Sequence, residues 1–223
     1  MNALAPADAA EVVALAQRIE LAITERQAEQ LESFAAMLKK WNRAFNLLSR
    51  RDIDRLWSRH ILDALTISSL LAGGRVMDFG TGGGFPGLPL AVVNPDLQFV
   101  LLDRHQRKCR FLEQVVHTLE LSNTKVICGQ VAEVAGSLGR FASITSRAVA
   151  PAPEIWVQVA DLLEPGGRVI VMAGTGRAEF RAPAGSRCES RHVPGLEAPH
   201  EVVIMDADER IGESSEHNRD TIG

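Results

Sequence analysis

The chain has 223 residues, of which 46% are hydrophobic and 23% charged, and its formal net charge is −4. These values are typical of a globular protein with one domain and an extension, and the negative charge argues against a general affinity for nucleic acid. No apolar run reaches the roughly 18 residues of a membrane span, and the start of the chain lacks the pattern of a secretory signal.

The cysteines and the charges are unevenly placed. Cys109, Cys128 and Cys188 lie far apart, which predicts reduced thiols in a cytosolic protein and no metal site. Residues 39–60 hold seven Lys or Arg against two Asp, and residues 104–110 hold four Lys or Arg without an acid. This distribution permits a local basic surface on an acidic protein.

The first 72 residues predict a helical extension. A short helix is expected over 8–20, and the Thr24–Gln27 capping box starts a second helix that is interrupted from Asn42 to Leu48. A third helix begins at Ser49 or Asp52 and runs to about Leu71. Its buried stripe consists of Ile53, Leu56, Trp57, His60, Ile61 and Ala64.

A glycine-rich turn follows this extension. Val76–Phe79 predicts a buried strand, the glycines between Gly80 and Gly84 allow positive φ and close approach to a ligand, and a helix starts near Leu88. A strand, a glycine turn and a helix N-terminus together predict a cradle for a nucleotide-like cofactor.

Two classes of cofactor fit this turn. The spacing of Asp78, Gly80, Gly82 and Gly84 is similar to the first motif of S-adenosylmethionine methyltransferases, while Gly82, Gly84 and Gly87 fit the dinucleotide fingerprint. Asp78 favours the methyltransferase, because the dinucleotide fingerprint does not require an acid there. A glycine-rich turn without a ligand is the third interpretation.

An acid follows the next predicted strand. Asp103 lies 23 residues after Gly80, where an acid in doubly wound sheets accepts hydrogen bonds from ribose hydroxyls. The alternative is an N-cap of the helix that follows. Arg147 lies past another predicted strand, at the edge where ligands bind in such sheets.

The remainder of the chain alternates between strands and helices. Strands are expected at 98–102, 125–128, 141–145 and 168–172, with helices at 105–119, 130–135 and 152–163 between them. Two last strands, 190–193 and 201–206, form an antiparallel pair. The pattern predicts an α/β, Rossmann-like domain over 73–207, with a mostly parallel seven-stranded sheet and helices on both faces. A polar tail, 208–223, follows it.

Several stretches together resemble the RsmG family, also called glucose-inhibited division protein B. The resemblance extends from about Leu31 to Gly174, and its combination of motifs is highly specific. The stretches are Trp41–Leu47, Arg59–Asp63, Asp78–Gly82, Gly84–Leu90 and Thr145–Val149.

The resemblance implies a class I methyltransferase that acts on bacterial 16S ribosomal RNA. It would transfer a methyl group from S-adenosylmethionine to N7 of one guanine, at position 527 in the usual numbering. Its partner would be the small ribosomal subunit, and we expect a monomer. By motif, the cofactor would contact Gly80 and Phe85, Ala132 and Glu133 would flank its adenine, Asp103 would take its ribose, and Arg147 would line its pocket.

Guanine N7 carries a lone pair, so the reaction needs no general base and the sequence assigns no catalytic residue. The protein must supply orientation, which contributes up to about 7–11 kcal/mol in favourable cases. His60 falls in a buried helical stripe and is expected to be a packed, hydrogen-bonded histidine. The target is expected to be an unpaired loop base, because the groove of duplex RNA hides that atom.

The RNA contacts are predicted from the extension. Arg51, Arg55 and Arg59 are four residues apart, so in an α-helix they form one basic stripe for phosphates or an ordinary solvated face. Asn46 is either a turn residue or a base contact.

Two other functions stay open. A nicotinamide-dependent oxidoreductase could be built on Gly82, Gly84 and Gly87, although the chain has no tyrosine for a Ser-Tyr-Lys type of site. A non-catalytic RNA-binding or assembly factor could keep the same fold.

Overall fold

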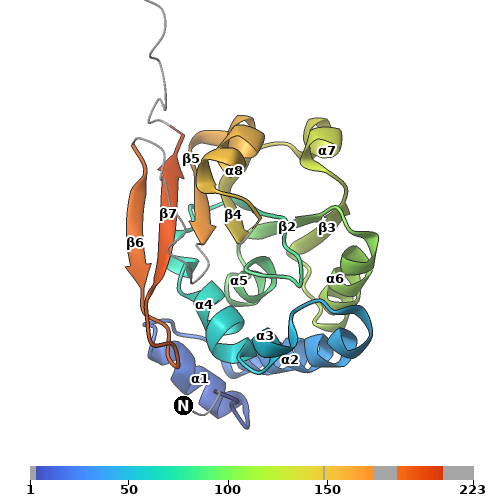
Figure 1. The fold of residues 1–223 in the computed structure, drawn as a ribbon, viewed down its shortest axis with the longest axis vertical. Helices are drawn as coiled ribbons and strands as arrows, with labels where there is room; N and C mark the ends of the chain where they lie inside the picture. The colour runs from blue at the N-terminus through green and yellow to red at the C-terminus, as the bar shows by residue number, and fades with distance from the viewer. Residues whose placement is uncertain (1–3, 148, 173–184, 208–223) are drawn as a thin grey trace, which may run out of the picture.

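A seven-stranded sheet organises the protein in a computed structural model that describes residues 4–147, 149–172 and 185–207 (Figure 1). The strand order is β3-β2-β1-β4-β5-β7-β6, in which the first five strands are parallel and β7 is antiparallel to β5 and β6. The strands are β1 (Arg75–Phe79), β2 (Gln98–Asp103), β3 (Thr124–Cys128), β4 (Phe141–Arg147), β5 (Leu163–Met172), β6 (Arg187–Arg191) and β7 (His200–Asp206). The predicted fold is confirmed.

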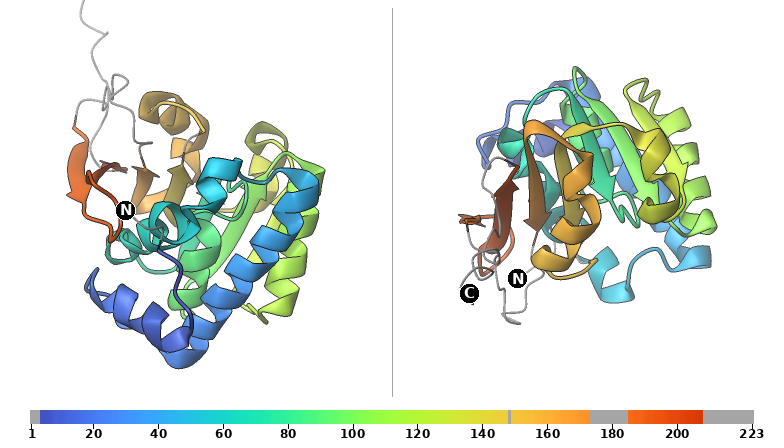
Figure 2. Two further views of the ribbon diagram at one scale, coloured as in Figure 1. Left: turned by 60° about the horizontal axis from the view of Figure 1, so that its bottom comes forward. Right: turned by 90° about the horizontal axis from the view of Figure 1, so that it is seen from above.

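The strands follow from apolar runs that are buried on both faces. One face packs against α5 (Gly87–Val93), α6 (Gln106–Thr118) and the N-terminal helices. The other packs against α7 (Val131–Leu138) and α8 (Ala152–Val159), which the short 3-10 helix η3 (Ala160–Leu162) follows (Figure 2). The strand β5 begins earlier than predicted, because the expected turn at 164–167 lies inside it, opposite a register irregularity in β4.

The first helices share a core with the sheet domain. They are α1 (Ala9–Gln17) and α2 (Glu25–Phe45), and the predicted capping box of Thr24 and Gln27 starts α2. Phe34 of α2 packs on Phe85 of the glycine-rich loop, with ring centroids 5.2 Å apart. The helix α2 runs past Trp41 to Phe45, because these two rings pack 5.2 Å apart, and Asn46 ends it in the left-handed conformation.

The third helix was predicted as one regular α-helix, and this prediction was wrong. The segment consists of α3 (Arg50–Ile53), a π-helical stretch η1 (Trp57–Leu62), α4 (Asp63–Leu65) and the 3-10 helix η2 (Ser68–Leu70). A π turn holds more residues than an α turn. The angular spacing of side chains along this segment therefore differs from that of an α-helix.

The described ranges contain no helix that is long and apolar enough to cross a membrane. The predicted polar tail, 208–223, lies outside the described residues.

Candidate functional site

The loop between β1 and α5 lies at the carboxyl ends of the parallel strands. The amide of Gly80 donates to the Leu102 carbonyl at 2.9 Å, and the amide of Gly82 donates to the Asp103 carboxylate at 2.9 Å. Gly82 has φ +61°, and a Cβ on it would meet no atom closer than 3.8 Å. The loop is therefore fastened to β2 while Gly82 leaves open space beside it.

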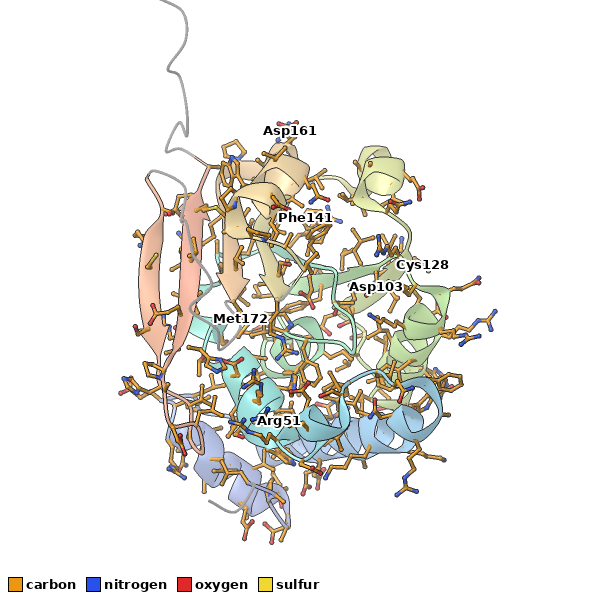
Figure 3. All side chains as sticks on the ribbon, viewed as in Figure 1. Arg51, Asp103, Cys128, Phe141, Asp161 and Met172 are labelled. Carbon is orange, nitrogen blue, oxygen red and sulfur yellow. The ribbon has the colours of Figure 1, made fainter. Side chains whose placement is uncertain are left out.

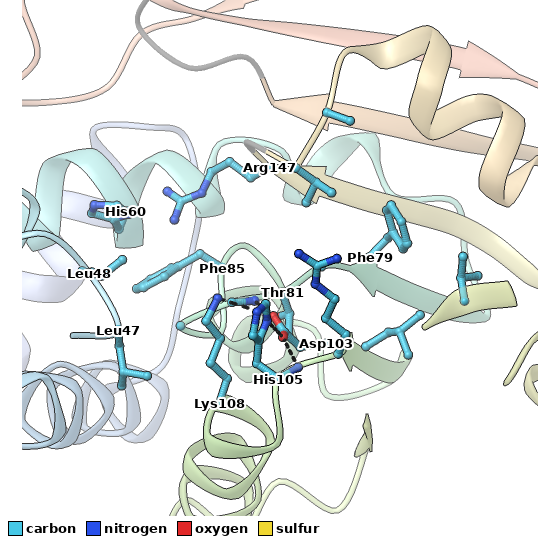
Figure 4. A pocket seen from close by; sticks show the side chains of 18 of the residues that line it. Leu47, Leu48, His60, Phe79, Thr81, Phe85, Asp103, His105, Lys108 and Arg147 are labelled. Atoms are coloured by element: carbon cyan, nitrogen blue, oxygen red, sulfur yellow. Dashed lines mark hydrogen bonds and ion pairs between the residues drawn. The ribbon is translucent and has the colours of Figure 1, made fainter. Parts of the chain in front are cut away.

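A cavity of about 740 Å³ opens over this loop. Figure 4 shows Asp103, His105 and Phe79 toward one end and His60, Arg147 and Phe85 toward the other. The cavity is lined by six of the nine predicted cofactor residues, which are Gly80, Gly82, Phe85, Asp103, Ala132 and Arg147.

Asp78 and Gly84 were predicted as cofactor contacts, but they do not line the cavity among the described residues. Asp78 is fully buried, where its carboxylate accepts the Gly87 amide at 2.8 Å and the Thr145 hydroxyl at 3.1 Å. Burial raises the pKa of Asp78 to about 6. A Cβ on Gly84 would lie 2.4 Å from Leu88 Cδ1. Both residues thus hold the loop against the core.

Asp103 is not the N-cap of α6, because that position is taken by His105, and its contact with a ribose stays a prediction. It lines the cavity, yet one of its oxygens accepts both the backbone amide of His105, at 2.8 Å, and Nδ1 of the same residue, at 2.9 Å. The other oxygen accepts the Gly82 amide and lies 3.8 Å from the Lys108 ammonium. A carboxylate oxygen accepts two hydrogen bonds, so the second oxygen retains capacity for a ligand hydroxyl.

The segment after β3 places Ala132 on the cavity wall but turns Glu133 away. Glu133 is exposed, and its carboxylate accepts the Gln130 amide at 3.2 Å in a capping box of α7. Its predicted cofactor contact is therefore absent from the cavity lining of the described chain. Gln130 and Val131 line the wall instead; neither was predicted from the sequence, although their place after a parallel strand is a usable signal.

Arg147 ends β4, and its side chain lines the cavity at the end that holds His60 (Figure 4). Its guanidinium lies 4.9 Å from the centroid of the Phe85 ring and donates to the Arg59 carbonyl at 3.2 Å. Because a guanidinium has five N–H donors in a fixed fork, Arg147 retains further donors for a ligand in the cavity that it lines.

His60 is buried as predicted, with 6% of its surface exposed. The predicted hydrogen bond of its ring is absent among the described residues. Both of its ring nitrogens lack such a partner in the part of the chain that the structure describes, and Nε2 lies 3.7 Å from the Asp52 carboxylate. The ring packs on Phe85 in a tilted arrangement, with centroids 5.1 Å apart. Burial, reinforced by the charge of Arg147, lowers the pKa of His60 to about 3. The ring is neutral at physiological pH.

Asp63 and His200 form a buried pair that was not predicted from the sequence. Nδ1 of His200 lies 2.8 Å from an oxygen of the Asp63 carboxylate, and the two side chains are 4% and 3% exposed. Both residues line the cavity. They are 137 positions apart in the chain, so no local sequence pattern predicts this contact.

The predicted RNA residues are not brought together as one stripe. Arg51 is exposed on α3, while Arg59 lines the cavity and forms an ion pair with Asp52 at 3.5 Å (Figure 3 labels Arg51). Arg55 is partly buried in the turn between these elements. The single stripe was wrong because it assumed a continuous α-helix. Asn46 is exposed and ends α2 in the left-handed conformation, so it occupies a turn, and its contact with the base stays a prediction.

The fold is that of known methyltransferases. It is similar to precorrin-6Y C5,15-methyltransferase from Geobacter metallireducens (TM-score 0.51, 14% identity, covering 72% of this chain and 90% of that chain). It is also similar to a predicted O-methyltransferase from Agrobacterium tumefaciens (TM-score 0.50, 19% identity, covering 61% and 74%). The fold is therefore the Rossmann-like fold of these methyltransferases, with a glycine-lined cavity at the carboxyl edge of its sheet.

The sequence comparisons give the family. Residues 27–199 match the GidB family, described as rRNA small subunit methyltransferase G. Relatives named ribosomal RNA small subunit methyltransferase G include those of Erwinia tasmaniensis (38% identity, covering 87% of this chain and 97% of the relative) and Chromobacterium violaceum (39%, covering 84% and 92%). The chain belongs to this family, which confirms the resemblance and removes the oxidoreductase alternative. The antiparallel β7 agrees, because the dinucleotide fold has a parallel strand there.

Proposed function

We propose that this protein transfers a methyl group from S-adenosylmethionine to N7 of a guanine in 16S rRNA, at position 527 in the usual numbering. It acts in the cytoplasm on RNA of the small ribosomal subunit. The observation that carries the proposal is one continuous cavity, lined by the glycine turn and Asp103 at one end and by buried polar groups at the other. Such a cavity has room for a cofactor and for a second reactant beside it.

The residues present fit the cofactor. The open space beside Gly82 accommodates a ligand close to the backbone, and Asp103 retains an oxygen for a ribose hydroxyl. Ala132 presents a small side chain on the wall that would flank the adenine. A volume of about 740 Å³ lies within the range of natural ligand sites. When bound, S-adenosylmethionine supplies an electrophilic methyl group on a positively charged sulfur.

The chain's own residues then have to orient the base rather than deprotonate it. Guanine N7 has a lone pair at neutral pH, so no side chain must remove a proton. His60 is neutral and adds no positive charge next to the cationic cofactor. The ring of Phe85 attracts the Arg147 guanidinium, 4.9 Å from its centroid, by its quadrupole and so holds this side chain in the cavity.

The RNA itself is proposed to contact Asn46, Arg51, Arg55 and Arg59. Arg51 and Asn46 are exposed beside the cavity-lining residues Leu47, Leu48 and Asp52, and Arg59 belongs to the wall itself. Cationic side chains at the mouth would hold phosphates on either side of an extruded base.

Two measurements test the proposal. Titration of the purified protein with S-adenosylmethionine and, separately, NADH should show binding of the first only. Incubation with labelled S-adenosylmethionine and small subunits from cells lacking the gene should place one methyl group per particle on N7 of the target guanine. Cofactor binding without methyl transfer would favour the non-catalytic assembly factor. Methylation of another atom would contradict the proposed chemistry.

A further inference from the structure

The substrate end of the cavity holds a buried carboxylate whose geometry is fixed. Asp63 is 2% exposed, and His200 donates from Nδ1 to one of its oxygens at 2.8 Å. Among the described residues, His200 is the side chain that donates a hydrogen bond to the Asp63 carboxylate. With Nδ1 protonated, Nε2 of His200 is an acceptor, and this nitrogen is buried without a partner among the described residues.

Asp63 and His200 therefore both present acceptor atoms to a wall that Arg147 and Arg59 also line. A buried polar atom without a partner costs about 1–3 kcal/mol, so the arrangement favours a ligand that brings N–H groups. Asp63 comes from α4 and His200 from the start of β7. Neither lies on the strands that hold the glycine turn and Asp103. The acceptors thus belong to the elements added to the parallel sheet, at the end remote from Asp103.

Guanine has the matching donors. Its Watson–Crick edge carries N1–H and the 2-amino group side by side, and a carboxylate accepts both at once. Adenine presents an acceptor, N1, at the same place, which a carboxylate repels. N7 lies on the opposite edge of the purine, so a base held by N1–H and the amino group leaves N7 free to face the other end of the cavity.

We propose that Asp63 is the specificity-determining residue that reads the Watson–Crick edge of the target guanine, and that His200 positions its carboxylate. The inference rests on the proposed function, since it concerns the base whose N7 is methylated. An extruded base is read in this manner by other enzymes that act on nucleobases. The competing role for Asp63 is to hold the ammonium group of the cofactor.

The test exchanges both the protein group and the base. Small subunits with guanine or adenine at the target position serve as substrates, since both purines carry an N7 lone pair. Asp63→Asn replaces one acceptor oxygen with an amide donor, which can donate to N1 of adenine while the remaining oxygen accepts from its 6-amino group. The ratio of kcat/KM for guanine over adenine should fall by about 10- to 100-fold, with S-adenosylmethionine affinity within about twofold of wild type. Because the ratio is taken within one preparation, it does not depend on the folded fraction.

His200 is tested by a matched pair of variants. His200→Leu keeps the carboxylate but removes its donor, and the ratio should fall. His200→Asn carries an N–H at the same number of bonds from Cβ as Nδ1, and it should restore the ratio. Asp161→Asn removes an exposed carboxylate that does not line the cavity and should leave the ratio unchanged. If Asp63→Asn methylates neither base, the guanine-to-adenine ratio of His200→Leu tests the inference instead. A ratio equal to that of the wild type would then contradict it.

If the wild type is active and Asp63→Asn keeps the wild-type ratio of guanine to adenine, this inference is wrong, while the proposed function stands. Loss of cofactor affinity with an intact ratio also overturns the inference and assigns Asp63 to the cofactor. An inactive wild type overturns the proposed function, and this inference falls with it.

Discussion

At the scale of single residues, the site depends on a hydrogen bond that links two functions. The amide of Gly82 donates to Asp103, so the residue proposed to hold ribose also fixes the turn proposed to approach the cofactor. Open space beside Gly82 is what makes that approach possible. Filling this space should therefore remove binding without removing the fold.

We predict that Gly82→Asp weakens S-adenosylmethionine binding by about 100-fold or more, which corresponds to about 3 kcal/mol. The new side chain would enter the cavity and bring a negative charge next to Asp103. Aspartate tolerates positive φ better than most residues, so the far-ultraviolet circular dichroism should match wild type. Calorimetric titration measures the affinity, and Gly82→Asn separates bulk from charge. Wild-type affinity in a folded Gly82→Asp protein would contradict the prediction.

His60 should leave a signature in the pH dependence of stability. Its pKa is about 3 in the folded chain against 6.5 for a free histidine, so below about pH 6.5 the unfolded chain binds a proton that the folded chain does not. His60 therefore makes the free energy of unfolding fall as pH falls, with a slope of up to about 1.4 kcal/mol per pH unit. Asp78 acts in the opposite direction between about pH 6 and 3.8, because its raised pKa lets the folded chain take the proton first.

We predict that His60→Gln removes the His60 contribution to this slope. Urea unfolding between pH 4.5 and 6 measures the free energy of unfolding, and only the slope is compared, so a general loss of stability does not matter. His117→Gln changes an exposed histidine and should keep the wild-type slope. Equal slopes in wild type and His60→Gln would show that the folded chain protonates His60 normally.

At the scale of elements, the strands and most helices could be predicted, because their signals are local. The apolar run Val76–Phe79 and the capping box at Thr24 required only neighbouring residues. The segment 49–71 could not be predicted, because a π turn at Trp57–Leu62 depends on what the turn packs against. Its consequence is functional, since Arg59, His60 and Asp63 all reach the cavity from this one segment.

The same segment predicts which substitutions weaken RNA binding. Replacing Arg51 and Arg55 with glutamine should lower the affinity for the small subunit and flatten its salt dependence by roughly 0.7–0.9 for each phosphate that is no longer neutralised. Binding at several salt concentrations measures the slope, with cofactor affinity as an internal check. Arg18→Gln removes an exposed arginine from the end of α1 and serves as the matched control. An unchanged slope would return Arg51 and Arg55 to an ordinary solvated surface.

At the scale of the whole molecule, the fold was more predictable than the site. The alternation of strands and helices along the chain predicts a mostly parallel sheet, and a ligand site at the carboxyl edge follows from such a sheet. The pairing of Asp63 with His200 could not be predicted in this way. It requires β7 to return next to β5 and to bring its first residue against α4. Asp78 was predicted from its motif as a cofactor contact, but its buried hydrogen bonds to Gly87 and Thr145 give it a structural role.

The central claim is that this chain methylates N7 of one guanine in 16S rRNA, and mass mapping of that RNA tests it most directly. RNA from cells with and without the gene would be digested and compared across the 527 region. We predict that a single methyl group on this guanine is lost with the gene and restored by the wild-type chain, but not by Gly82→Asp. Identical methylation in both strains, or loss of a methyl group elsewhere, would contradict the claim.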